Sequence, residues 1–121
     1  MSKNMEISFL LDFYGDMLTE KQRNMVDYYY NEDLSLAEIA ENEGITRQGV
    51  RESIKRAEAQ LLEMEDRLAL AARFRRMQND LLIVQEHAKL LRTVNDLNGR
   101  IPEIYEIAQT LSAAADRMNE A

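Results

Sequence analysis

The sequence predicts an all-α protein in which a helix-turn-helix bundle is followed by long C-terminal helices. Residues 35–61 carry the capping and turn signals of two helices joined at a glycine. Apolar residues then recur three or four positions apart as far as Leu91, with no proline or glycine between Val50 and Asn98. The chain has one proline, four glycines and few β-branched residues. This composition argues against strands and long loops.

The first predicted helix runs from Met5 to Leu18. One of its stripes consists of residues four apart, which lie on the same side of a helix. These residues are Met5, Phe9, Phe13 and Met17. Leu10, Tyr14 and Leu18 flank this stripe. We expect it to pack in the core rather than to line a ligand pocket, because apolar stripes at helical spacing usually serve packing.

The second predicted helix begins after Thr19, which can form a capping box with Gln22. Its buried side is expected to comprise Met25, Val26 and Tyr29. Consecutive residues of a helix point about 100° apart, so the three tyrosines at positions 28–30 cannot all be buried. We expect one or two of these rings to remain partly exposed.

The helix-turn-helix motif occupies residues 35–61. Ser35 and Glu38 form a second capping box, and Gly44 suits the left-handed residue that follows a helix end. Thr46 is then the expected N-cap of the second helix, whose first turns begin with Arg47. Four residues of this helix are spaced to face inward: Val50, Ile54, Ala57 and Leu61. The pattern is typical of a helix presented to a nucleic-acid groove.

Beyond the motif, the apolar seam slips at Ala71, where two steps of three residues fall together. This slip predicts a bend or break between Glu65 and Phe74, with Asp66 as the candidate cap of the new helix. The sequence Asn98-Gly99 predicts a helix end. Residues 102–118 then predict a last helix that starts at a proline and folds back as a hairpin. The expected domains are residues 1–66, the helix-turn-helix domain, and residues 67–121, a helical hairpin.

Residues 18–57 resemble region 4 of bacterial sigma factors, and the chain as a whole resembles the YlxM family of small bacterial proteins. The resemblance is carried by FLLDFYGDMLTEKQRN at residues 9–24, by the continuous match at residues 28–68, and by the Arg-Phe pair that follows at 73–74. It implies a sigma-region-4-like bundle. It also implies an association with the signal recognition particle and its GTPase.

Composition narrows the function classes further. The chain has no cysteine, which is compatible with a reducing compartment, and its start lacks the apolar run of a signal peptide. No apolar run is long enough to cross a bilayer. We therefore expect a cytoplasmic protein without membrane attachment.

Catalytic and metal-binding patterns are missing from the sequence. His87 is the single histidine, and no cysteine or second histidine accompanies it, so we expect an ordinary surface position. The carboxylates between Glu32 and Glu43 indicate a solvated acidic face. We expect no enzyme activity, no cofactor and no metal ion.

The charge distribution marks the candidate binding residues. The net charge is −7, and residues 1–66 hold 7 Lys and Arg against 15 Asp and Glu. Within this acidic part, residues 46–58 carry four cations and two carboxylates. The expected nucleic-acid-binding residues lie on the exposed side of the second motif helix. They are Thr46, Arg47, Gln48, Arg51, Glu52, Lys55 and Arg56. Arginine and glutamine there can form paired hydrogen bonds to guanine or adenine.

Two functions follow from these observations. The first is a regulatory protein that binds nucleic acid through this helix, with DNA favoured over RNA. The second is an interaction module whose acidic residues 20–43 dock on a basic partner. The family resemblance implies that this partner is the signal recognition particle GTPase, through its methionine-rich RNA-binding part, or the whole ribonucleoprotein.

We also expect a homodimer formed through the C-terminal half. The last helix hides only one stripe of a wide apolar surface, and large exposed apolar patches favour self-association. The expected seam comprises Leu61, Met64, Leu68, Phe74, Met77, Leu81, Val84 and Leu91, widened by Leu82, Ile83, Leu90 and Val94. The alternative is a monomer in which the hairpin folds onto its own N-terminal bundle.

Overall fold

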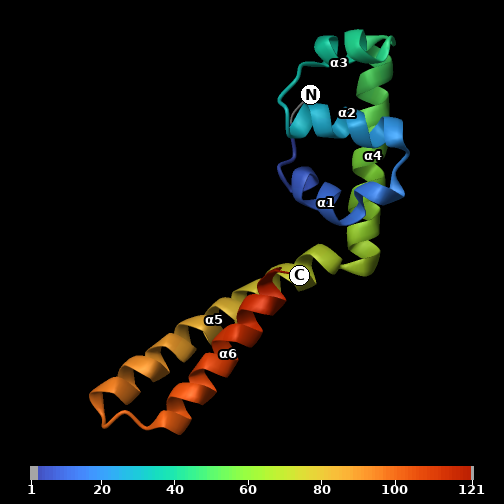
Figure 1. Cartoon of the computed structure of the whole chain (residues 1–121). Coiled ribbons are helices and arrows are strands. Elements are labelled where there is room, and N and C mark those ends of the chain that lie inside the picture. The colour runs from blue at the N-terminus through green and yellow to red at the C-terminus, as the bar shows by residue number, and fades with distance from the viewer. Residues whose placement is uncertain (1–2, 121) are drawn as a thin grey trace. The chain divides into compact units, whose positions relative to one another are not determined.

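The computed structural model describes residues 3–120, and all of the regular elements in this range are helices (Figure 1). In order they are α1 (Glu6–Tyr14), the 3₁₀ helix η1 (Gly15–Met17), α2 (Glu20–Tyr30), α3 (Leu36–Glu43), α4 (Arg47–Leu68), α5 (Leu70–Leu97) and α6 (Pro102–Glu120). The predicted all-α fold class is confirmed. The chain divides into two compact units, Met1–Ala72 and Arg73–Ala121.

In the N-terminal unit, α1, α2 and α3 all pack against the long helix α4 (Figure 1). The inward side of α4 is the predicted one, since Val50, Ile54, Ala57 and Leu61 are completely buried. They meet apolar side chains from each of the other helices, including Leu10 of α1. A single core therefore holds one side of α4 and leaves its other face to solvent.

The first helix differs from the prediction in length and in the side that it buries. It ends at Tyr14 and gives way to η1, whereas a helix from Met5 to Leu18 was expected. Of the expected stripe, Met5 and Met17 are each 72% exposed and are not core residues, whereas Phe9 and Phe13 are half-buried and pack against the core. The core stripe consists of Ile7, Leu10, Leu11 and Tyr14. Apolar residues cover two sides of this helix, and only the position of α4 selects between them.

The second helix follows the prediction. The Thr19 hydroxyl accepts the backbone N–H of Gln22 at 3.1 Å, and the Gln22 side chain accepts the Thr19 N–H at 3.2 Å. Among the three tyrosines, Tyr29 and Tyr30 are buried and Tyr28 remains half-buried. The expectation that part of this tyrosine run stays exposed is confirmed.

The helix break falls within the predicted window but uses a different cap. Ala69 adopts a left-handed conformation, with φ 53°, and separates α4 from α5. Asp66 is not the cap. The Glu65 carboxylate accepts the N–H groups of Ala71 and Ala72, both at 3.0 Å. Glu65 thus satisfies two of the backbone donors that a helix start leaves without partners.

The C-terminal unit is a hairpin of α5 and α6 (Figure 1). Gly99 takes φ 101° in the connecting turn, and Pro102 is the first residue of α6, as predicted. The buried Asn95 side chain closes the turn, donating to the Ile101 carbonyl at 2.9 Å and accepting the Ile101 N–H at 2.8 Å. Across residues 3–120, no helix combines the length and apolar character needed to span a membrane.

Candidate nucleic-acid interface

The α3–turn–α4 segment has the predicted helix-turn-helix geometry. The Ser35 hydroxyl accepts the Glu38 N–H at 3.1 Å, and the Glu38 carboxylate accepts the Ser35 N–H at 3.2 Å. Gly44 ends α3 with φ 68°, a conformation that other residues adopt only with strain. Thr46 then caps α4, because its hydroxyl accepts the Gly49 N–H at 3.0 Å. Side-chain hydrogen bonds therefore define the starts of both α3 and α4.

All seven predicted binding residues are exposed at the N-terminal end of α4. Arg47, Arg51 and Lys55 follow one another at intervals of four residues and form one ridge on the helix. Gln48, Glu52 and Arg56 form the adjacent ridge. The structure therefore brings the predicted residues together on one exposed end of one helix.

The side chains of these ridges differ in how free they are to turn. Within residues 3–120, Arg47, Arg51, Lys55 and Arg56 form no side-chain hydrogen bond or ion pair. The Gln48 amide donates to Glu52 at 3.2 Å, so these two residues engage each other across one turn. A free cation can turn towards a phosphate or a base edge, whereas Gln48 must first leave Glu52.

The surroundings of this cationic end are acidic. Helix α3 carries Glu38, Glu41 and Glu43 and no lysine or arginine. In a helix-turn-helix docked on duplex DNA, the first helix crosses the phosphate backbone, where carboxylates are repelled. Within the α3–α4 segment, favourable charge for a polyanion therefore lies in the first half of α4.

Two buried tyrosines anchor α4 further along, in its C-terminal half. The Tyr30 hydroxyl of α2 donates to Glu58 at 2.6 Å, and the Tyr14 hydroxyl of α1 donates to Glu65 at 2.6 Å. The two glutamates are seven residues apart, so the anchors lie two turns apart on one side of α4. Burial, followed by the hydrogen bond to Glu58, raises the pKa of Tyr30 to about 12.

Sequence reasoning missed these anchors. Glu58 and Glu65 are two among many surface carboxylates, and nothing in their spacing separates them from the rest. Tyr14 was expected beside the core and Tyr30 in a run that cannot be wholly buried, and no partner was predicted for either hydroxyl, although a buried tyrosine hydroxyl usually needs one. This need for a partner was the one feature of the sequence that could have pointed to the anchors.

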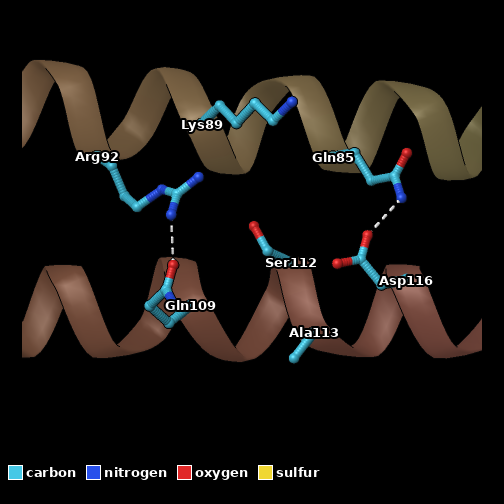
Figure 2. Close-up of a pocket in the computed structure, with 7 residues that line it drawn as sticks. All are labelled: Gln85, Lys89, Arg92, Gln109, Ser112, Ala113 and Asp116. Atoms are coloured by element: carbon cyan, nitrogen blue, oxygen red, sulfur yellow. Dashed lines mark hydrogen bonds between the residues drawn. The ribbon is translucent and has the colours of Figure 1, made fainter.

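A second polar feature is a groove of about 380 Å³ between α5 and α6 (Figure 2). Arg92 donates to the Gln109 side chain at one end, and Gln85 donates to Asp116 at 2.7 Å towards the other. Lys89 and Ser112 lie between these pairs (Figure 2). We name the hollow of Figure 2 the polar groove.

The single histidine, His87, is exposed, and its Nδ1 lies 2.9 Å from the Ile83 carbonyl oxygen in its own helix.

The family model that matches this chain is described as "Putative helix-turn-helix protein, YlxM / p13 like", and it covers residues 1–111. A UPF0122 protein of Desulforamulus reducens is 43% identical over 94 residues, which is 78% of this chain and 73% of the relative. The UPF0122 protein of Bacillus mycoides is 38% identical over 111 residues, covering 92% of this chain and 98% of the relative.

A further UPF0122 protein, from Acetivibrio thermocellus, is 41% identical over 119 residues and covers 88% of this chain and 99% of the relative. The family match over residues 1–111 includes the motif, α5 and the first half of α6. The geometry of α3 and α4 and the extent of the matches lead to one conclusion. The chain belongs to the UPF0122 family of YlxM / p13-like helix-turn-helix proteins.

Proposed function

We propose that the protein is a cytoplasmic regulator that binds nucleic acid, DNA in preference to RNA, through the N-terminal half of α4. The observation that carries the proposal is the set of four unpaired cations on that half. Arg47, Arg51, Lys55 and Arg56 are exposed, while Val50 and Ile54 fix the opposite side of the helix in the core. A rigid helix with free cations on one side can enter a groove without losing its own packing.

The residues have different roles in this proposal. Arg47 and Arg51 lie in the first turns of α4, where recognition helices contact base edges, and each can form paired hydrogen bonds with guanine. Gln48 can read adenine after it leaves Glu52. Lys55 and Arg56 lie further along and contact phosphates, which positions the helix without reading sequence.

The test is a variant with Arg47, Gln48, Arg51 and Lys55 all replaced by alanine. It is assayed for binding to a pool of random duplexes and to total cellular RNA. We expect binding to fall at least tenfold. The matched control replaces Arg67, Arg100 and Arg117 by alanine, which removes the same positive charge from exposed positions elsewhere. Equal binding by wild type and the quadruple variant would refute the proposal.

A second candidate function is favoured by the acidic surface. Residues 20–43 hold seven carboxylates and two cations, which suits a basic protein partner. Following the family resemblance, that partner is the signal recognition particle GTPase or its ribonucleoprotein. Pull-downs from lysate with and without nuclease separate the two functions. A partner that resists nuclease and is released by salt supports docking, and loss of all partners after nuclease supports nucleic-acid binding.

The proposed active form is a homodimer joined through the C-terminal region, residues 67–121. A two-fold axis places two reading helices in equivalent positions, as two half-sites of a palindromic sequence require. The helix-turn-helix domain, residues 1–66, then carries recognition and the hairpin carries assembly.

A further inference from the structure

The hairpin buries few of its own large side chains. In the described part of the C-terminal unit, the buried residues are Ala88, Asn95, Ala108 and Ala115. Three of these are alanines and one is polar, so the seam between α5 and α6 removes little apolar surface from water. Helices in water depend mainly on packing of their apolar side, and small units need additional support. This hairpin therefore lacks a core of its own.

The two open sides of the hairpin have opposite chemistry. One side is the polar groove, lined by Lys89, Arg92 and Asp116 among others (Figure 2). Another hollow between the same helices, of about 410 Å³, is lined almost entirely by apolar side chains. Its lining comprises Ile83, Val84, His87, Ala88, Leu91 and Leu111. The large aliphatic residues thus border an open groove.

This groove is the centre of a wider surface that we name the hairpin apolar face. It consists of Ile83, Val84 and Leu91 of α5 with Ile107, Leu111 and Met118 of α6. Helical spacing places the three α6 residues on one side of that helix, at steps of four and seven. Their side chains and those from α5 are between 37% and 56% exposed. No described segment of the C-terminal unit covers them.

We propose that the hairpin apolar face is the homodimer interface, and that it pairs with the same face of a second copy to form a four-helix bundle. The inference rests on the dimer of the proposed function and assigns its surface. Each copy contributes α5 and α6, and the open groove of one copy receives aliphatic side chains of the other. The polar groove then faces solvent in both copies.

The exposed area of the hairpin apolar face agrees with a second copy as its partner. Six aliphatic side chains that are about half exposed offer on the order of 500 Å² per copy. Pairing two copies then removes about 1,000 Å² from water, which reaches the lower bound for a specific interface. A face built mainly from apolar side chains pairs best with another such face, and a second copy supplies one by symmetry.

The N-terminal unit supplies no matching surface. Most of its large apolar side chains are packed in one core around α4. The exposed ones, such as Met5, Met17 and Leu62, come from separate elements and form no comparable continuous face. The hollow on that unit is lined mainly by polar and charged residues, including Asp12, Asp16, Arg23 and Asp27. Burying an aliphatic face against such groups leaves them without water or partners. A second hairpin is therefore the better occupant.

The face also corrects the seam expected from sequence. Leu61 is completely buried in the N-terminal core, and Met64 packs against that core. Phe74 and Leu81 are half-buried. These residues already pack, wholly or in part, within their own chain. Helix α6, which was expected only to cover part of the seam, contributes half of the hairpin apolar face.

The test compares two charge substitutions by sedimentation equilibrium of the full chain. Leu111 is 44% exposed and Leu82 is 53% exposed, so neither variant disturbs a buried site in the monomer. Leu111 lies in the apolar groove, and Leu82 lies nine residues from Leu91, on the opposite side of α5. We expect Leu111→Glu to weaken dimerisation at least 100-fold and Leu82→Glu to change it less than threefold.

The possible results distinguish failure of the assigned interface from failure of the homodimer proposal itself. Wild-type protein that stays monomeric at high micromolar concentration overturns both the homodimer and this interface. A Leu111→Glu variant that dimerises as strongly as wild type overturns the interface alone. If Leu111→Glu loses helicity by circular dichroism, Ile107→Glu, at a position 56% exposed, provides the same measurement. Nucleic-acid binding by the monomeric variant shows whether recognition survives without assembly.

Discussion

The Tyr14 hydroxyl donates to the Glu65 carboxylate at 2.6 Å and accepts the backbone N–H of Leu70 at 3.1 Å. The same carboxylate accepts the N–H groups of Ala71 and Ala72. One tyrosine of α1 and one glutamate near the end of α4 therefore satisfy three backbone donors in the first turn of α5. Burial and the Glu65 hydrogen bond raise the pKa of Tyr14. The hydroxyl is thus held in its neutral, donating form.

Replacing Tyr14 by phenylalanine is expected to lower the free energy of unfolding by about 1–2 kcal/mol, because the Leu70 N–H and Glu65 lose their shared partner. Urea unfolding measures the loss, and hydrogen exchange should accelerate at residues 70–72. Tyr28→Phe is the matched control, since the Tyr28 ring is half-buried and its hydroxyl has no described partner. Equal losses in both variants would show that the Tyr14 hydroxyl contributes nothing specific.

Stability is expected to fall at high pH through Tyr30. Its pKa is raised to about 12 in the folded protein, against an ordinary value near 10 in the unfolded chain. The folded state therefore favours the neutral hydroxyl, and this contribution is complete below pH 10 and is lost between about pH 10 and 12. Urea unfolding across this range measures the effect. Tyr30→Phe should show a shallower decline, and an identical decline would exclude Tyr30 as its source.

Thr46→Ala is expected to cost about 1 kcal/mol of unfolding free energy, because the hydroxyl caps the Gly49 N–H at the start of α4. Ser53→Ala in the same helix is the control, since Ser53 lies inside α4 and forms no capping hydrogen bond among the described residues, and its replacement should stay within about 0.5 kcal/mol. Both are measured by urea unfolding. Frayed amides at residues 47–49 in Thr46→Ala alone would support the cap, and equal stability of the two variants would contradict it.

Arg51→Ala is expected to lose about 1–3 kcal/mol of binding free energy on a duplex selected from a random library. Its loss on unrelated duplexes should be smaller, because a base contact stabilises only the matched sequence. Fluorescence anisotropy on both duplexes measures the difference. Arg67→Ala, an exposed position near the end of α4, is the control. Equal losses on matched and unrelated duplexes would assign Arg51 to phosphate contact instead.

Lys55→Ala is expected to weaken binding to all sequences alike. Each phosphate contact contributes about one unit to the slope of log K against log salt, so the slope should decrease by about one. Titrations at several salt concentrations measure it. Lys89→Ala, in the polar groove of the hairpin, should leave the slope unchanged. An unchanged slope in Lys55→Ala would remove this residue from the phosphate contacts.

Sequence alone was sufficient for the features that depend on a few neighbouring residues. Thr19, Ser35 and Thr46 were placed correctly as helix caps, since a cap bonds a backbone group only three residues away. Gly44 and Pro102 were recognised by the backbone angles that they permit. The exposed side of α4 followed from the spacing of its buried residues. The fold class and the candidate interface both derive from such local chemistry.

Tertiary structure decided the features in which several residues of similar chemistry compete. Glu65, and not Asp66, caps α5, because the folded chain brings Tyr14 and the first turn of α5 to that carboxylate. Helix α1 has apolar residues on two sides, and α4 packs against only one of them. Leu10 is therefore buried, whereas Met5 stays exposed. The apolar face of the hairpin depends on which sides of α5 and α6 meet. These choices need the position of a distant helix, and residue spacing carries no information about it.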